Sequence, residues 1–182
     1  MGIKRSFLIV VVAMCTTPVL FAQVRMDGFA FSPKLGCFHM ANHSDGVGLG
    51  GEFQVRERNN LFSLGYYEGY DIFMRYPSQG PTHSVWLMIG KYRGERLSRL
   101  YYQIGISPVW GRKNYLIGNS QDIITQNFFR MGLGMQVGYA LLVSRSVGLG
   151  VDMHANLNTE GCMYMPMLSL KIGRLRRSLQ RE

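Results

Sequence analysis

The chain has 182 residues, enough for one domain and too few for two large ones. Only 17% of the residues are charged, against about 25% in soluble domains, whereas 47% are hydrophobic. This deficit of charge argues against an ordinary water-exposed surface. The net charge of +9 is compatible with nucleic-acid binding. The export signal described next excludes nucleic acid as the expected partner.

The first 22 residues have the pattern of a secretory signal peptide. Lys4 and Arg5 supply the positive start, and residues 7–14 form a short apolar core. Ala22 suits cleavage, so the mature chain is expected to begin at Gln23. The apolar core is shorter than the roughly 20 residues that a spanning helix needs, and no later run is longer. An exported chain with little charge and no spanning helix predicts a closed β-barrel, in which every backbone polar group is paired.

Alternation of large apolar residues with small or polar ones predicts the strands, because a period of two places the two sets on opposite faces. The clearest run is Phe129–Val143, where every odd position is large and apolar. Glu68 falls on the apolar face of another run, which suggests a β-bulge at Gly65 or Gly69. Eight strands are expected, at residues 29–40, 49–56, 62–72, 84–93, 100–111, 127–143, 147–158 and 164–172.

The predicted connections alternate between longer loops and tight turns. The loops are expected at Ala41–Gly46, Tyr76–His83 and Arg112–Gln126, with a shorter one at Thr159–Gly161. The tight turns are expected at Asn59–Asn60, Gly94–Ser98 and Ser144–Ser146. Long loops on one rim and short turns on the other are typical of membrane barrels, whose short turns face the periplasm. The loop at 112–126 is the expected binding surface, since function tends to lie on loops.

The composition of the two strand faces indicates which one contacts lipid. One face carries Leu, Val, Met and Tyr, and the other is rich in Gly with a few polar residues. Small residues suit the crowded lumen of a narrow barrel, and glycine makes a poor solvent-facing surface. The alternative is a soluble periplasmic ligand-binding barrel with its apolar face inward, which would need a charged outer face.

Together these features resemble the small eight-stranded outer-membrane barrels of Gram-negative bacteria, of the OmpA transmembrane-domain and OmpX type. The resemblance covers about Gly28 to Leu175 and rests on strand number, loop alternation and the signal ending Phe21-Ala22-Gln23. It implies an all-β, eight-stranded antiparallel up-and-down transmembrane barrel over residues 23–175. It also implies insertion by the barrel-assembly machinery and contact with outer-membrane lipid and lipopolysaccharide. Unlike many such proteins, this chain does not end on an aromatic residue, and residues 176–182 form a basic periplasmic tail.

An eight-stranded barrel has a lumen that side chains fill, which disfavours a diffusion pore. Polar residues on its inward face are expected to pair with one another, since an unpaired charge in a low-dielectric interior is costly. This predicts an internal polar network of Glu52, Gln54, Arg56, Gln103, Arg130, Asp152 and His154. The expected function is a structural or surface-interaction role, with no cofactor and no metal site.

The alternative function is a barrel enzyme that hydrolyses or transfers acyl chains of lipid A or phospholipid. Barrels of this size include lipid A deacylases and acyltransferases, which use a His, a Ser and an acidic residue near the outer rim. The corresponding candidates are His43, Ser44 and Asp45, with His39 and His83 also near that rim. Adjacent strand residues point to opposite faces, however, and the deacylase His-x-Ser pattern is absent, so no catalytic residue is assigned.

Two of the three cysteines remain in the mature chain, because Cys15 leaves with the signal. Cys37 lies near the top of the first predicted strand and Cys162 near the top of the last. Closing the barrel makes these strands neighbours, which allows a disulfide across the closure seam in an oxidising compartment. The alternative is two unpaired thiols that serve as small apolar side chains.

Basic residues gather at the rim expected to face the periplasm. They flank the tight turns and fill the C-terminal end: Arg56, Arg58, Arg93, Arg96, Arg99, Arg145, Arg174, Arg176, Arg177 and Arg181. This rim is suited to anionic lipid headgroups or to an acidic periplasmic partner. A plain solvated edge is the alternative.

Overall fold

The computed structural model describes residues 26–41, 44–72, 80–94, 97–116, 123–159 and 161–175. Its strands are β1 (Gly28–Met40), β2 (Ser44–Glu57), β3 (Asn60–Asp71), β4 (Thr82–Arg93), β5 (Ser98–Ile106), β6 (Val109–Leu116), β7 (Ile123–Arg130), β8 (Gly132–Leu142), β9 (Val147–Asn158) and β10 (Gly161–Arg174). The predicted signal peptide and basic tail lie outside the described residues. Within those residues, no helix has the length and apolar character needed to cross a membrane.

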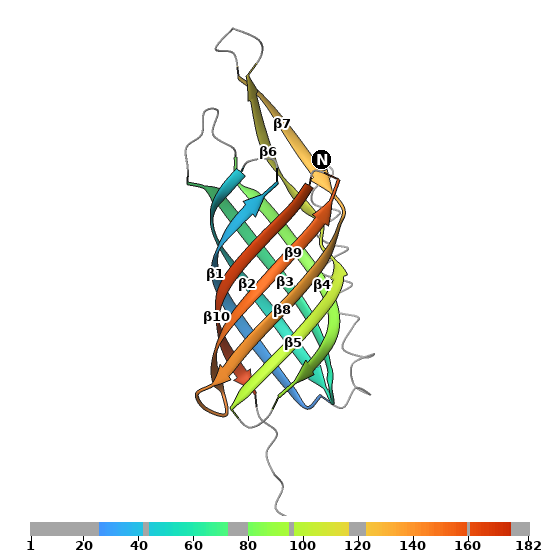
Figure 1. Cartoon of the computed structure of the whole chain (residues 1–182), viewed down its shortest axis with the longest axis vertical. Coiled ribbons are helices and arrows are strands. Elements are labelled where there is room, and N and C mark those ends of the chain that lie inside the picture. The colour runs from blue at the N-terminus through green and yellow to red at the C-terminus, as the bar shows by residue number, and fades with distance from the viewer. Residues whose placement is uncertain are drawn as a thin grey trace, which may run out of the picture.

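The strands close into one antiparallel barrel (Figure 1). β1 pairs with β2 on one side and with β10 on the other, so the first and last strands close the ring. β5 continues into β6 along a single barrel strand, and β7 continues into β8. Their pairs keep one register from Ser98↔Leu141 to Leu116↔Ile123. The chain therefore forms the eight-stranded up-and-down barrel predicted from the sequence.

β6 and β7 rise above the barrel as a hairpin (Figure 1). β6 pairs with β4 only from Val109 to Gly111, and within the described residues β7 pairs with β6 alone. The prediction of a long loop at 112–126 is therefore wrong for most of that segment, since Arg112–Leu116 and Ile123–Gln126 are strand. The β-branched residues from Ile123 to Thr125 favour strand, and they continue the register already set below them.

The predicted bulge in β3 is absent. All pairs between β2 and β3 keep one register, from Glu57↔Asn60 to Gly46↔Asp71. Glu68 consequently stays on the outer face, where its carboxylate accepts hydrogen bonds from Tyr70 (2.6 Å) and Tyr66 (3.3 Å). Neighbouring phenols satisfy this outward carboxylate, so no change of register is needed.

The tight turn between β2 and β3 is one residue earlier than predicted. Glu57 pairs with Asn60, so the turn consists of Arg58 and Asn59. Arg58 has a positive φ of 52°, and its N–H donates to the Asp27 carboxylate at 2.7 Å. The predicted turn at Ser144–Ser146 is confirmed: the Ser144 hydroxyl accepts from the backbone N–H groups of Ser146 and Val147.

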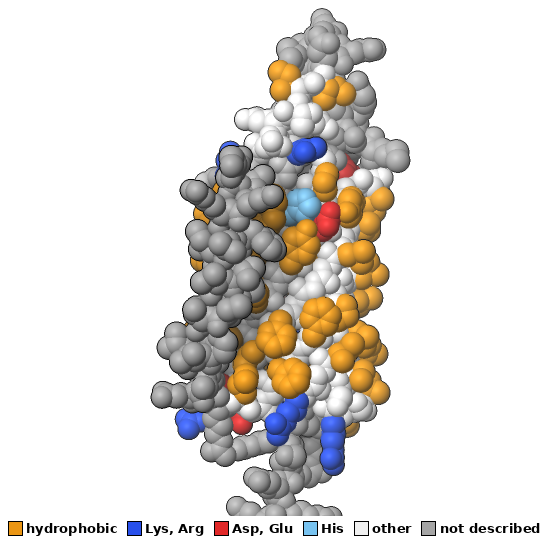
Figure 2. All heavy atoms as spheres, turned by 180° about the vertical axis from the view of Figure 1, so that it is seen from behind, with side chains coloured by type: hydrophobic (Ala, Val, Ile, Leu, Met, Phe, Trp, Pro, Cys, Tyr) orange, Lys and Arg blue, Asp and Glu red, His pale blue; other side chains and the backbone are white. Residues whose placement is uncertain are grey.

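The outer face of the barrel is apolar over its height. Leu49, Leu149 and Leu168 expose 62%, 57% and 63% of their surface. Figure 2 shows hydrophobic side chains spread over one side of the barrel, with basic side chains at its lower end. A soluble barrel would need charge on this face, so the arrangement is the one expected of a barrel that contacts lipid.

The lumen is filled in layers. Its upper part holds a cluster of apolar and aromatic side chains from β1, β3, β4, β6 and β10: Phe38, Met40, Tyr67, Trp86, Met88, Val109, Met163, Met165 and Met167. Its lower end holds Ala30, Leu142 and Leu175. Inward glycines make room for the large rings; a Cβ added to Gly65 would lie 2.2 Å from the Trp86 indole. Polar side chains occupy the middle of the lumen, below the upper cluster, and Arg56 lies beside the apolar side chains of the lower end.

Candidate functional site

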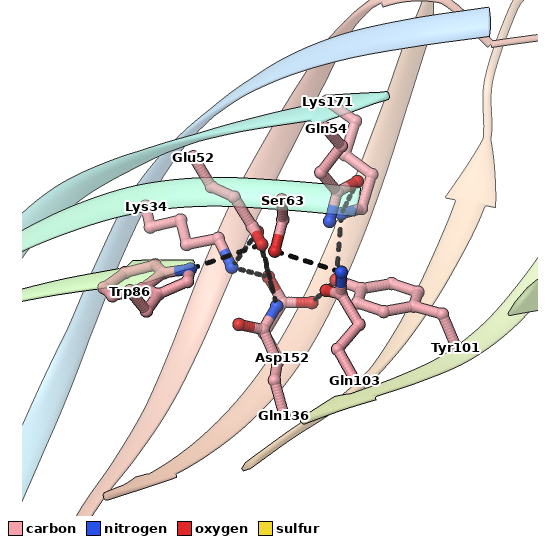
Figure 3. Close-up of polar contacts among 10 residues, drawn as sticks. All are labelled: Lys34, Glu52, Gln54, Ser63, Trp86, Tyr101, Gln103, Gln136, Asp152 and Lys171. Carbon is pink, nitrogen blue, oxygen red and sulfur yellow. Dashed lines mark hydrogen bonds and ion pairs between the residues drawn. The ribbon is translucent and has the colours of Figure 1, made fainter. Parts of the chain in front are cut away.

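Three buried charges meet in the middle of the lumen (Figure 3). Lys34 on β1 places its Nζ 2.5 Å from the Glu52 carboxylate and 2.8 Å from the Asp152 carboxylate, and all three side chains are fully buried. Glu52 lies on the neighbouring β2, whereas Asp152 on β9 lies two strands away through β10. Lys34 thus links β2 to β9, two strands that are not hydrogen-bonded to one another.

A second lysine extends this group toward the lower end. Lys171 on β10 donates to Tyr101 Oη at 2.9 Å and to Gln54 Oε1 at 3.3 Å. The Tyr101 hydroxyl in turn donates to Asp152. We call Lys34, Glu52, Asp152, Lys171 and Tyr101 the lumen network. Its two lysines and two carboxylates balance in charge, as a low-dielectric interior requires.

Neutral side chains complete the bonding of the carboxylates. Trp86 Nε1 donates to Glu52 at 3.4 Å, and Gln136 Nε2 donates to Glu52 at 3.3 Å. His154 lies against Trp86, with ring centroids 4.8 Å apart. Several strands therefore contribute donors to one carboxylate, which fixes the barrel strands relative to one another.

The structure brings together most of the residues predicted for the lumen. Glu52, Gln54, Gln103, Asp152 and His154 are buried inside it. Arg56 is also buried but lies at the lower end, where it donates to Tyr92 and to the Leu175 carbonyl.

Arg130 is not part of the predicted network. It ends β7 at the base of the projecting hairpin, is half-buried and donates to the Phe129 carbonyl at 3.0 Å. β7 keeps the strand parity of the barrel, because Phe128 packs against the upper apolar cluster while Phe129 is exposed. Arg130 is therefore separated from the network by its height at the upper rim and not by its face.

Sequence reasoning missed both lysines of the network. Lys34 has the opposite strand parity from Phe31 and Leu35, which point outward. Lys171 lies between Leu170 and Ile172, which also point outward. Strand parity was therefore sufficient to place both inward. The apolar upper cluster was missed in the same way, because Met163, Met165 and Met167 share the parity of Lys171.

Of the candidate catalytic residues at the upper rim, the described side chains of His39, Asp45 and His83 form two separate groups on the outer face, and for Ser44 only the backbone in β2 is described. His43 lies outside the described residues. Asp45 pairs with His39, which is its cross-strand neighbour. His83 accepts or donates a bond with Tyr66 at 2.8 Å and stacks on Trp110. Within the described part of the chain, no three His, Cys, Asp or Glu side chains are grouped to hold a metal ion.

The predicted disulfide across the closure seam is wrong. Cys37 and Cys162 are free thiols. The Ala41 N–H donates to the Cys162 carbonyl at 2.9 Å, so Cys162 is level with Ala41, four residues beyond Cys37. Four residues span about 13 Å along a strand, and a disulfide needs Cα atoms within about 7 Å. The two cysteines share a seam but not a height.

Comparison with known proteins agrees on the fold. No protein-family model matches the sequence, and no curated protein matches it. Neisserial surface protein A has a TM-score of 0.61 at 14% identity, covering 80% of this chain and 96% of its own. The N-terminal β-barrel domain of Pseudomonas aeruginosa OprF has a TM-score of 0.60 at 10% identity, covering 81% and 98%.

A third similar structure is Ail, the attachment invasion locus protein of Yersinia pestis. Its TM-score is 0.58 at 8% identity, and the match covers 81% of this chain and 99% of Ail. All three are small eight-stranded outer-membrane barrels, and the matches cover nearly their whole length. The closed ring, the apolar outer face and these matches lead to one conclusion: the chain has the fold of the small eight-stranded outer-membrane β-barrels.

Proposed function

We propose that this chain is a structural and surface-contact protein of the bacterial outer membrane, in which the barrel is a closed anchor and the β6–β7 hairpin makes the contact. The observation that carries the proposal is the open edge of β7. This strand stands above the barrel and, within the described residues, pairs with β6 alone. An unpaired strand edge is a ready template for a strand of another chain.

The composition of this edge supports a contact role. Ile123–Phe129 reads Ile-Ile-Thr-Gln-Asn-Phe-Phe, with no charge, proline or glycine. Natural proteins usually protect exposed edges with lysine, proline or a bulge. Ile123 and Ile124 are about half exposed, and so is Phe129. An unprotected apolar edge outside the lipid-facing wall is the feature expected of a binding surface.

The lumen supports the anchor role. The side chains of the lumen network and of the apolar clusters are buried inside the barrel. The barrel is therefore filled rather than open. One structural neighbour, Ail, is named an attachment invasion locus protein, which agrees with a contact role for this architecture.

The proposed partners include the lipids around the barrel. The outward group of Tyr66, Glu68, Tyr70 and His83 lies near the upper rim, where its aromatic and polar side chains would meet the polar headgroups of lipopolysaccharide. Exposed arginines such as Arg93 and Arg174 lie at the lower rim, which suits anionic headgroups or an acidic periplasmic partner. The barrel-assembly machinery remains the proposed route of insertion.

Adhesion of intact cells tests the contact role. The full chain is expressed in a bacterial host that lacks it, and binding to a layer of bacterial or animal cells is counted. Wild-type cells should bind more than cells with an empty vector. The double change Ile124→Lys and Gln126→Lys should return binding to the vector level, because charge protects an edge strand. The control Ser146→Lys, an exposed position at the opposite rim, should bind like the wild type.

Labelling of single cysteines tests the orientation. In a background without Cys37 and Cys162, Thr125→Cys should react with a membrane-impermeant maleimide on intact cells. Ser146→Cys should react only after permeabilisation. The reverse labelling pattern, or wild-type adhesion at the vector level, would remove the proposed function.

A further inference from the structure

A cavity of about 40 Å³ lies at the lower end of the lumen, between the lumen network and Leu175. Its polar lining comes from Gln54, Lys171, the phenols of Tyr92 and Tyr101 and three arginines, Arg56, Arg99 and Arg174, and none of its described lining residues is acidic. Because Arg174 and Phe29 line it and are exposed, the cavity reaches the surface at the lower rim. One water needs about 10–15 Å³, so the volume has room for a compact polyatomic ion.

The charge around this cavity is positive. Lys171 is balanced within the lumen network, whereas the groups to which the Arg56 guanidinium donates are neutral. The Arg56 guanidinium donates to the Tyr92 hydroxyl (3.0 Å) and to the carbonyls of Leu175 (3.1 Å) and Asp27 (3.3 Å). Arg56 and Arg99 both lie over the Tyr92 ring, at 5.0 and 5.1 Å from its centroid.

Hydrogen-bond donors converge on the cavity and lack acceptors. Gln54 is more than nine-tenths buried, and its Nε2 has no hydrogen-bond partner. Its Oε1 is engaged by Lys171, which fixes the amide with the donor side free (Figure 3). Arg56 has five N–H groups, of which three are engaged. The ammonium of Lys171 has three, of which two are engaged.

We propose that this cavity binds a phosphate oxyanion, carried either by free phosphate or by a phospholipid headgroup at the lower rim. The site needs a compact ligand with negative charge and several acceptor oxygens. A guanidinium next to an amide and an ammonium provides charge-assisted donors of the kind that bind phosphate. The ligand would satisfy the buried Gln54 amide, which is otherwise costly to leave unbonded.

Calorimetric titration with inorganic phosphate tests the site. The full chain is folded in octyl glucoside micelles, which carry no phosphate, and titrated at neutral pH. Wild-type protein should bind one phosphate with a saturable isotherm. Gln54→Glu should abolish binding, because its carboxylate takes the same donors. It should also raise the melting temperature by about 2–4 °C, which separates loss of binding from loss of folding.

Two arginine variants separate the cavity from general surface attraction. Arg56→Gln should weaken phosphate binding about tenfold, the loss expected for one charge-assisted hydrogen bond. Arg93→Gln is the matched control, since Arg93 lies at the same rim but outside the cavity, and it should bind within twofold of the wild type. The proposal fails if wild-type binding is not saturable, if Gln54→Glu binds like the wild type, or if Arg93→Gln weakens binding as much as Arg56→Gln.

The source of the phosphate is identified by changing the lipid. The same titration is repeated in nanodiscs of a galactolipid and in nanodiscs that also contain phosphatidylglycerol. If the headgroup is the ligand, phosphatidylglycerol will compete and weaken the apparent affinity for free phosphate. If affinity is the same in both nanodiscs, the ligand of the site is a soluble oxyanion.

Discussion

Lys34 is the residue on which the lumen network depends, because it alone bridges both buried carboxylates. Replacing it with Met leaves Glu52 and Asp152 together in a dry interior with one lysine. Breaking a buried ion pair from one side costs about 3–5 kcal/mol. Lys34→Met should therefore lower the free energy of unfolding by about that amount. Urea unfolding in lipid vesicles, followed by the fluorescence of the two tryptophans, measures it, since Trp86 donates to Glu52 of the network.

Two further variants give this prediction its controls. Lys91→Met removes an exposed lysine of β4 and should change stability by no more than about 0.5 kcal/mol. Adding Glu52→Gln to Lys34→Met restores charge balance and should recover part of the loss. Equal stability of Lys34→Met and Lys91→Met would show that the buried bridge does not hold the barrel together.

The β6–β7 hairpin is the element proposed to make the surface contact, whereas the barrel below it is the membrane anchor. Its pairs continue the register of β5 and β8 without interruption, from Ser98↔Leu141 through Arg112↔Asn127. Deleting residues 113–126 and joining Arg112 to Asn127 through Asn-Gly, a favoured hairpin turn, should therefore leave the barrel folded. The shortened protein should keep a compact form that migrates differently on gels until it is boiled. Loss of that form would show that the hairpin is needed for folding.

At the scale of the whole molecule, the filled lumen predicts that the barrel does not conduct ions steadily. An apolar cluster fills the lumen above the lumen network, and the central charges are fully buried. Purified protein in a planar bilayer should show no stable conductance step, whatever the voltage sign. A reproducible step of constant size would contradict the anchor role and indicate a continuous aqueous path.

The alternation of inward and outward positions along each strand, its parity, is what made part of the lumen site predictable from the sequence. Parity correctly placed Glu52, Asp152 and His154 inside, and it would have placed Lys34 and Lys171 there as well. Arg130 also has the inward parity, opposite the buried Val109, but it lies at the upper rim above the network. Parity states which face a residue occupies but not its height, and the seam cysteines show the difference.

The alternation along the chain was enough to predict the number of barrel strands, their faces and, to within a residue, the tight turn between β2 and β3. These are local properties, since a period of two along one strand decides which side chains meet lipid. The folded barrel was needed to see which inward residues meet across the lumen, that Cys162 is level with Ala41, and that most of the longest predicted loop is strand. Those outcomes depend on the register between strands and on the stagger at closure, which are properties of strand pairs and of the closed ring rather than of any one segment.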